Sequence, residues 1–336
     1  MPRARDRFRL LFLCIFLVFY PALSAVAQNC ESSSDLDDAT RTAITSAAQR
    51  DFDLAAKGDT FTLRQNTISS LAANFTPIET TVKDHQSNLA GAQATVNSIF
   101  LLEADGTAPL PHAEFYCGVF GKNGQTPGSA IFDFNNLPPG KYGVALLEAT
   151  SPKGKTDFSL ILQQEGTDWK IGGLYVKDAD ISGHDADWFA TQALDYKAKG
   201  QLHNAWLYYL QARSLAAPVP FVDTLALDKL YNEFQKDKPA DFPENGKSAD
   251  LSVGTVSYKL IALYPQAVGN DLDVIVRYQV ANAGDSNQAY ASNMEVMKAL
   301  VGKYPELRSA FAAIVARAVD NSGHDYGTLL AMKEIR

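Results

Sequence analysis

The stretch Thr167 to Lys177, TDWKIGGLYVK, decides how this sequence is interpreted. Successive side chains of a β-strand point to opposite faces, so every second residue here is expected to face the same side. The residues expected together on one face are Trp169, Ile171, Gly173 and Tyr175. We predict a sheet strand that packs on a core and carries no chemistry.

This strand ends a run of alternating segments separated by turn-forming residues such as glycine, proline and aspartate. Six strands are predicted, at residues 96–104, 113–121, 129–134, 142–149, 156–164 and 169–177. Two helical patterns precede them, one starting near Asp35 and ending at Lys57, and one from Thr60 to Phe75. A further short helix or irregular piece is expected from Pro77 to Ala90. Helices followed by a meander predict an α+β protein, with N-terminal helices packed on a curved antiparallel sheet.

The first predicted unit, residues 35–180, contains two characteristic segments: FDLAAKGD, from Phe52 to Asp59, and GTDWKIGGLY, from Gly166 to Tyr175. These segments resemble the cone-shaped superfamily named for nuclear transport factor two. The resemblance is to small exported bacterial members of the superfamily. It implies a pocket between helices and sheet that hosts an enzyme, a binding site or only an interface. The matched residues include no pair of a carboxylate and a histidine, so the resemblance carries over no activity.

A helical unit is predicted over residues 185–238, with helices at 186–199, 202–215 and 222–235. Small and aromatic residues recur along its first two helices: Phe189, Ala193, Tyr196, Gly200, Ala205, Tyr209 and Ala212. Their spacing resembles one tetratricopeptide repeat, although Trp188 and Gln192 depart from the usual pattern. Repeats are stabilised by stacked neighbours, and we find no second copy. We therefore expect cover from the same chain, in preference to an exposed peptide-binding groove.

Residues 236–247 are charged and rich in proline, which predicts a linker. The remaining residues, 248–336, are expected to form a small ββαββ domain. Its predicted strands are 251–263, 273–280, 312–319 and 326–335, and its helix is 287–301.

Residues 1–27 are typical of a signal peptide, with four arginines, an apolar run and a small-residue cleavage site. An uncleaved anchor is the alternative. Removal of the four arginines and one aspartate changes the formal net charge from −8 to −11. Two cysteines then remain, and an exported chain commonly joins such a pair. We predict a disulfide between Cys30 and Cys117, against the alternative of one buried thiol and one free cysteine.

Few residues are candidates for chemistry. Asp84 and His85 lie in a predicted helix and His112 lies at a strand entrance, where exposed side chains are the simpler interpretation. Three other histidines have no metal-ligand spacing: His184, His203 and His324. We predict no metal and no other cofactor.

These patterns favour a non-catalytic exported protein, periplasmic or secreted, that binds a protein partner or an envelope component. A protein partner is expected at the helical hairpin. The acidic chain has no basic stripe, which argues against nucleic acid and, after signal cleavage, against a membrane surface. The alternative function is a pocket enzyme, a hydrolase or isomerase, acting from the cone-like unit.

Overall fold

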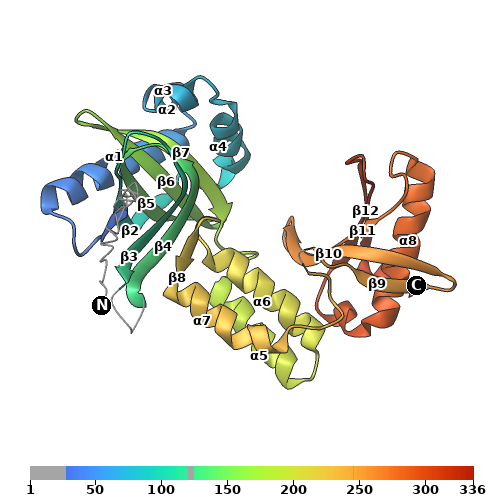
Figure 1. Ribbon diagram of the computed structural model, residues 1–336. Coiled ribbons are helices and arrows are strands. Elements are labelled where there is room, and N and C mark those ends of the chain that lie inside the picture. Colours follow the sequence, from blue (N-terminus) through green and yellow to red (C-terminus); the bar gives the residue numbers. More distant parts are fainter. Residues whose placement is uncertain (1–27, 120–124, 245) are drawn as a thin grey trace, which may run out of the picture.

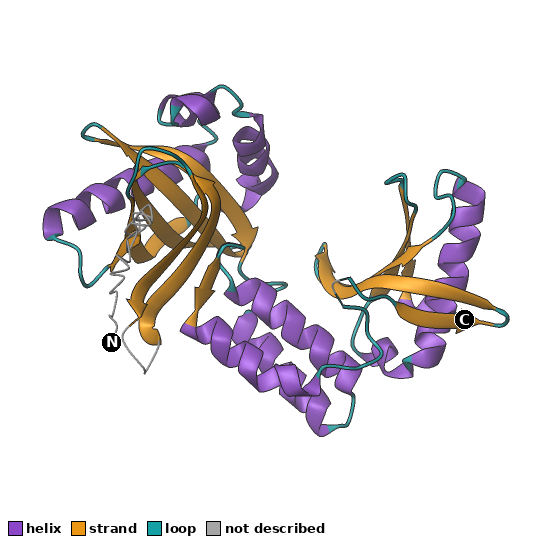
Figure 2. Ribbon diagram, in the orientation of Figure 1, coloured by secondary structure: helices purple, strands orange, loops and turns teal. Residues whose placement is uncertain are grey.

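The structure is a computed structural model that describes residues 28–119, 125–244 and 246–336. The predicted signal peptide, residues 1–27, lies outside the described residues. Figures 1 and 2 show helices together with largely antiparallel sheets, so the predicted α+β class is confirmed. Among the described helices, none has the length and apolar character needed to cross a membrane.

The first part of the chain is built on a five-stranded antiparallel sheet. Its order is β1 (Gln28–Ser32), β2 (Gln93–Ala104), β5 (Gly140–Ser151), β6 (Gly154–Glu165) and β7 (Asp168–Asp178). Four helices lie between β1 and β2 in the sequence: α1 (Asp38–Lys57), α2 (Thr60–Gln65), α3 (Ser69–Ala72) and α4 (Thr76–Leu89). Apolar side chains of α1 and α4 pack on one face of the sheet and form a buried cluster with it.

Two of the six predicted strands belong to a different sheet, which corrects the single meander. The hairpin of β3 (Leu110–Val119) and β4 (Gln125–Leu137) pairs with the short β8 (Val222–Thr224) and covers the other face of the main sheet. The predicted strand at 113–121 ends beyond the described part of β3. Alternation identified which side chains of each strand are buried. It could not assign the strands to one sheet or two, because strands of two packed sheets also bury every second side chain.

Strand β7 contains a bulge that corrects the predicted face. Ile161 pairs with Gly173 whereas its neighbour Leu162 pairs with Ile171, so one residue of β7 is extra. After the bulge the two faces are exchanged. Leu174 joins Trp169 and Ile171 on the helical side. Tyr175 faces the other way and packs on Phe221 with a ring separation of 5.2 Å.

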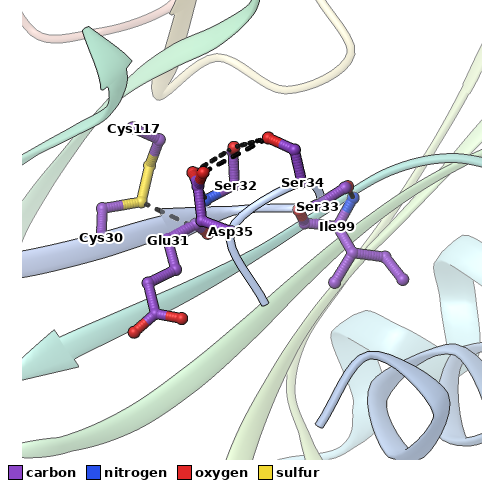
Figure 3. Close-up of a disulfide and its surroundings, with 8 residues drawn as sticks. All are labelled: Cys30, Glu31, Ser32, Ser33, Ser34, Asp35, Ile99 and Cys117. Carbon is purple, nitrogen blue, oxygen red and sulfur yellow. Dashed lines mark hydrogen bonds between the residues drawn. A yellow bond between two sulfur atoms is a disulfide. The ribbon is translucent and has the colours of Figure 1, made fainter. Parts of the chain in front are cut away.

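The predicted Cys30–Cys117 disulfide is present and joins β1 to β3 (Figure 3). Strand β1 was not predicted, because its sequence QNCES has no apolar alternation. The residues after it are held by hydrogen bonds: Ser33 Oγ donates to the carbonyl of Ile99 at 2.8 Å and accepts from its N–H at 2.9 Å. The disulfide and the pairing with β2 therefore fix the start of the described chain.

The helical unit contains α5 (Ala186–Ala198), α6 (Leu202–Ala216) and α7 (Leu225–Phe234). The first two helices form the predicted hairpin, with Gly200 in the left-handed conformation between them. The third was predicted to begin at Val222, which is wrong. Residues 222–224 instead pair with β4, and Thr224 caps α7 by accepting from the N–H of Leu227.

The C-terminal part is a second five-stranded sheet with one long helix on it. The strand order is β13 (Asp325–Ala331), β12 (Ala313–Val319), β11 (Asp271–Gln279), β10 (Val256–Val268) and β9 (Ala249–Val253), and α8 (Ser286–Lys303) connects the parallel pair β11 and β12. The predicted strand 251–263 is wrong, because Gly254 turns the chain in a left-handed conformation and creates two strands.

Two further strand limits are corrected. Strand β10 continues through Pro265 to Val268, on the half that has no β9 partner, where the missing N–H of proline is tolerated. The last predicted strand stops at Ala331 and a 3₁₀ turn, Met332–Glu334, follows.

The hairpin and the C-terminal sheet share one buried apolar cluster, which supplies the cover expected from the same chain. Tyr208 Oη donates to the carbonyl of Ala310 at 2.8 Å, and Asn204 Nδ2 donates to that of Glu306 at 2.8 Å. The predicted linker also takes part, since Phe242 is buried. Because these contacts join the two parts, their predicted limits as separate folding units, 185–238 and 248–336, remain a prediction.

The disulfide gives a first testable prediction. A Cys30→Ala substitution is expected to lower the free energy of unfolding by about 4 kcal/mol, because the cross-link spans 87 residues and restricts the unfolded chain. This substitution leaves the buried Cys117 side chain in place. Urea unfolding of the oxidised protein measures the effect, and reduced wild type should match the variant. Equal stability of the variant and the oxidised wild type would contradict the prediction.

A second prediction concerns Asp320, whose carboxylate accepts backbone N–H groups of Ala283, Ser322 and His324. These bonds, led by the one from Ala283, lower its pKa from 3.8 to about 2. The stabilisation is therefore present at neutral pH and is lost as the pH falls from about 5 toward 2. We expect Asp320→Asn to be less stable than wild type at pH 7, by a margin that narrows toward pH 3.

Urea unfolding at several pH values checks this expectation, with Asp84→Asn as the control because Asp84 is exposed on α4. A margin for Asp320→Asn that stays constant between pH 7 and pH 3 would overturn the assignment.

Candidate functional site

The candidate site surrounds the connector between β7 and α5, where all three parts of the chain meet. Three hollows with volumes of about 330, 320 and 210 Å³ lie there, and we call them the first, second and third junction hollows. The first and second share Lys155 as a wall residue. The second and third share Ile181, Ser182 and Asn270. The hollows are therefore neighbours along one connector.

The first hollow lies between the main sheet and the hairpin. Its floor comes from β2, β5 and β6, and its walls come from the start of α5 and the end of α6. Directly paired residues of neighbouring strands place Glu148, Asp157 and Lys177 in one row across β5, β6 and β7. Two of these are carboxylates that lie opposite each other, an arrangement that is unfavourable without a nearby cation.

Lys177 supplies that cation. Its Nζ lies 3.2 Å from Asp157 Oδ2 and donates to the carbonyls of Ser214 and Leu215, each at 2.8 Å. The two carbonyls belong to the last turn of α6, where no further N–H of the helix is available and a positive charge is favourable. Lys177 therefore ties the hairpin to the sheet.

Burial affects both members of this pair. It raises the pKa of Asp157, while the Lys177 ammonium acts in the opposite direction. It lowers the pKa of Lys177, and here the Asp157 carboxylate opposes the change. Each charge is thus maintained by the other.

Other polar groups of the connector are engaged in local structure. Asp180 accepts from the N–H groups of Lys155 at 2.7 Å and Gly183 at 3.2 Å. Asp185 caps α5 by accepting from the N–H of Trp188 at 3.1 Å. These bonds fix the course of the chain between β7 and α5.

The third hollow has an aromatic wall. The His184 ring stacks on Trp188 with a centroid separation of 3.8 Å, and Tyr208 and Phe189 line the same hollow. Across the connector, Ser182 Oγ donates to the carbonyl of Asn270 at 2.6 Å, in the turn between β10 and β11. The turn of the C-terminal sheet is thereby held against the connector.

The residues predicted as chemical candidates lie elsewhere. Asp84 is exposed on α4, and His85 Nδ1 lies 3.0 Å from the carbonyl of Thr81 on the same helix. His112 lies on the outer face of β3, beside Glu114 and Asp133. The structure does not bring these candidates to the junction.

The other three histidines contact different neighbours. His184 stacks on Trp188, and the other two lie beside carboxylates. His203 Nδ1 lies 2.6 Å from Glu306 and its Nε2 lies 3.1 Å from Asp241, which joins α6 to the C-terminal part. His324 lies beside Asp320.

Five of the seven repeat-spaced residues are buried: Phe189, Ala193, Ala205, Tyr209 and Ala212. Tyr196 is partly buried, and Gly200 is exposed in the turn between α5 and α6. The sequence analysis missed the row of Glu148, Asp157 and Lys177. The only signal in the sequence was a charged residue within a strand of otherwise apolar character. The partners of that residue can be identified only when the pairing register of the strands is known.

Comparisons of the chain with protein-family models, with curated proteins and with solved structures found no match. The resemblances to the cone-shaped superfamily and to the tetratricopeptide repeat therefore remain predictions.

The half-buried ion pair of Asp157 and Lys177 gives a third prediction. Lys177→Met leaves Asp157 without its nearest cation, and we expect the free energy of unfolding to fall by about 2 kcal/mol, less than for a fully buried pair. The matched control is Lys155→Met, because the Lys155–Glu148 pair is longer, at 3.4 Å, and more exposed. That control should cost less than about 1 kcal/mol. Urea unfolding measures both variants.

The cause of the loss can be separated from general damage. The double variant Lys177→Met/Asp157→Asn should recover part of the stability lost by Lys177→Met, since no unpaired charge remains. Protonation of Asp157 relieves the same charge, so the deficit of Lys177→Met should be smaller at pH 5 than at pH 8. A double variant that shows the full sum of the single losses would reject the pairing.

Proposed function

We propose that this chain is a non-catalytic exported binding protein that holds an extended, positively charged segment of a protein partner in the junction hollows. The observation that carries the proposal is the charge of their walls. Seven carboxylates and two lysines line the three hollows. The carboxylates are Glu148, Asp157, Asp178, Asp180, Asp185, Asp187 and Asp271.

This excess of negative charge favours a cationic ligand. Asp157 is paired with Lys177, and Asp180 and Asp185 are used in turns and a cap. Glu148 is paired with Lys155 at 3.4 Å. Asp187 and Asp271 are exposed, so their carboxylates are accessible to a ligand. A cleft with charge of one sign raises the local concentration of oppositely charged ligands.

The aromatic wall supports a peptide with arginine. A guanidinium group stacks favourably on an aromatic ring, and the exposed His184 ring, which is stacked on Trp188, offers such a face. Trp188 lies in the first turn of α5, so the ligand contacts the hairpin that was expected to receive a protein partner.

Binding is favoured over catalysis by the interior of the first part. The space between α1, α4 and the main sheet is filled by apolar side chains such as Phe52, Leu63, Phe158 and Ile171. At the junction, Asp157 forms an ion pair, Asp180 accepts hydrogen bonds in turns, and Asp185 caps α5, so these carboxylates have structural roles.

Export is proposed on two grounds. The first 27 residues have the composition of a signal peptide, and the Cys30–Cys117 disulfide is of the kind that persists in oxidising compartments. The destination is the periplasm or the medium.

A peptide titration tests the binding function. The probe is a fluorescein-labelled ten-residue peptide of alternating arginine and alanine, and fluorescence anisotropy reports binding to the purified protein. We expect the Asp187→Asn/Asp271→Asn protein to bind about tenfold more weakly, since two attractions to the cationic peptide are lost. Binding should also weaken when the ionic strength is raised from about 0.01 to 0.15 M.

Two controls are matched to this test. Glu233→Gln removes an exposed carboxylate of α7 that lines none of the three hollows, and it should leave the affinity unchanged. A peptide with glutamate in place of arginine should not bind. Equal binding of both peptides, or an equal effect of Glu233→Gln and the double variant, would reject the proposal.

A further inference from the structure

The outer face of the β3–β4 hairpin carries a cluster of one imidazole and two carboxylates. His112 Nδ1 lies 3.2 Å from Asp133 Oδ1, and His112 Nε2 lies 3.5 Å from Glu114 Oε1. One potential ligand atom from each of the three residues can be chosen so that all lie within 4.8 Å of one another. All three side chains are accessible from solvent.

The pairing of the strands forces these groups together. Glu114 lies directly opposite Asp133 in the antiparallel pair, and His112 is two residues from Glu114 on the same face. Two carboxylates in directly opposed positions repel each other. A cation between them removes that repulsion, and a neutral imidazole beside them adds a nitrogen ligand.

The cluster stands on a fixed base. The opposite face of the hairpin is buried through Ala113, Phe115 and Phe132, and the disulfide anchors β3 at Cys117. Side chains on a strand with a packed rear face keep their Cα positions, so only side-chain rotation is needed to bring the ligand atoms to a common ion.

Glu114 is also held by a neighbour outside the cluster. Tyr116 Oη donates to Glu114 Oε2 at 2.8 Å, which leaves Oε1 directed at the imidazole. Such a hydrogen bond to the far oxygen is the way in which outer groups orient a carboxylate ligand of a metal.

We propose that His112, Glu114 and Asp133 bind a divalent first-row transition-metal ion such as Zn²⁺. Imidazole with carboxylates suits such ions, whereas Mg²⁺ and Ca²⁺ prefer ligands that are all oxygen. The ion takes one of the two imidazole nitrogens, so the exposed ring turns to present it. Bonds of about 2.0 to 2.2 Å and one or more open positions, filled by water, complete the coordination.

Isothermal titration calorimetry with ZnCl₂ on the purified protein, free of any histidine tag, tests the proposal. We expect one Zn²⁺ per chain at this cluster, with affinity reduced at least about tenfold by His112→Ala and by Asp133→Asn. Tyr116→Phe keeps all three ligands but removes the hydrogen bond to Glu114, and should weaken binding about tenfold. An excess of CaCl₂ should not compete.

The matched control is His85→Ala, which removes a histidine of α4 whose Nδ1 lies 3.0 Å from the carbonyl of Thr81 on the same helix. This variant should bind Zn²⁺ as wild type does, and circular dichroism should show that all variants are folded. No heat of binding up to millimolar ZnCl₂, or an unchanged affinity in both His112→Ala and Asp133→Asn, would overturn the proposal.

Discussion

One extra residue in β7 determines where the charges of the junction point. Without the bulge near Gly172, strict alternation would place Lys177 on the same side as Trp169, toward α1 and α4. With it, Lys177 lies level with Asp157 on the opposite side and reaches the last carbonyls of α6. The α5–α6 hairpin is thus tied to the main sheet by a half-buried ion pair that a single backbone irregularity makes possible.

The hairpin is stable as a single unit because the rest of the chain covers it on more than one side. Strand β8 pairs with β4 immediately before α7, which packs on α6. The C-terminal sheet and the turn at Pro305–Ser309 cover α6 from another direction, and His203 bridges Asp241 and Glu306 across that contact. Such a hairpin does not need the stacked neighbours that stabilise a repeat array. The three parts are consequently connected by buried contacts and not by the connector alone.

Local patterns in the sequence predicted most of the elements, because helix periods, strand alternation and turn residues are local properties. The α5–α6 hairpin and the long strands β5, β6 and β7 follow their predicted ranges closely. Pairing is not local. The polar β1 is held by the predicted disulfide and by pairing at the edge of the sheet, and QNCES contains no local pattern that predicts this pairing. The rows Glu148–Asp157–Lys177 and Glu114–Asp133 depend on register, so their members could not be brought together from the sequence.

The two candidate sites differ in what binding would do to the molecule. His112, Glu114 and Asp133 all belong to one hairpin with a packed rear face, so an ion bound there stabilises an arrangement that the hairpin already has. The first junction hollow takes its floor from the main sheet and its walls from the start of α5 and the end of α6. A ligand that contacts the main sheet and the α5–α6 hairpin stabilises the position of one relative to the other by its own binding free energy. Binding at this hollow and the relative position of the main sheet and the α5–α6 hairpin are therefore thermodynamically linked. A movement that separates the two also separates the ligand from one of its walls.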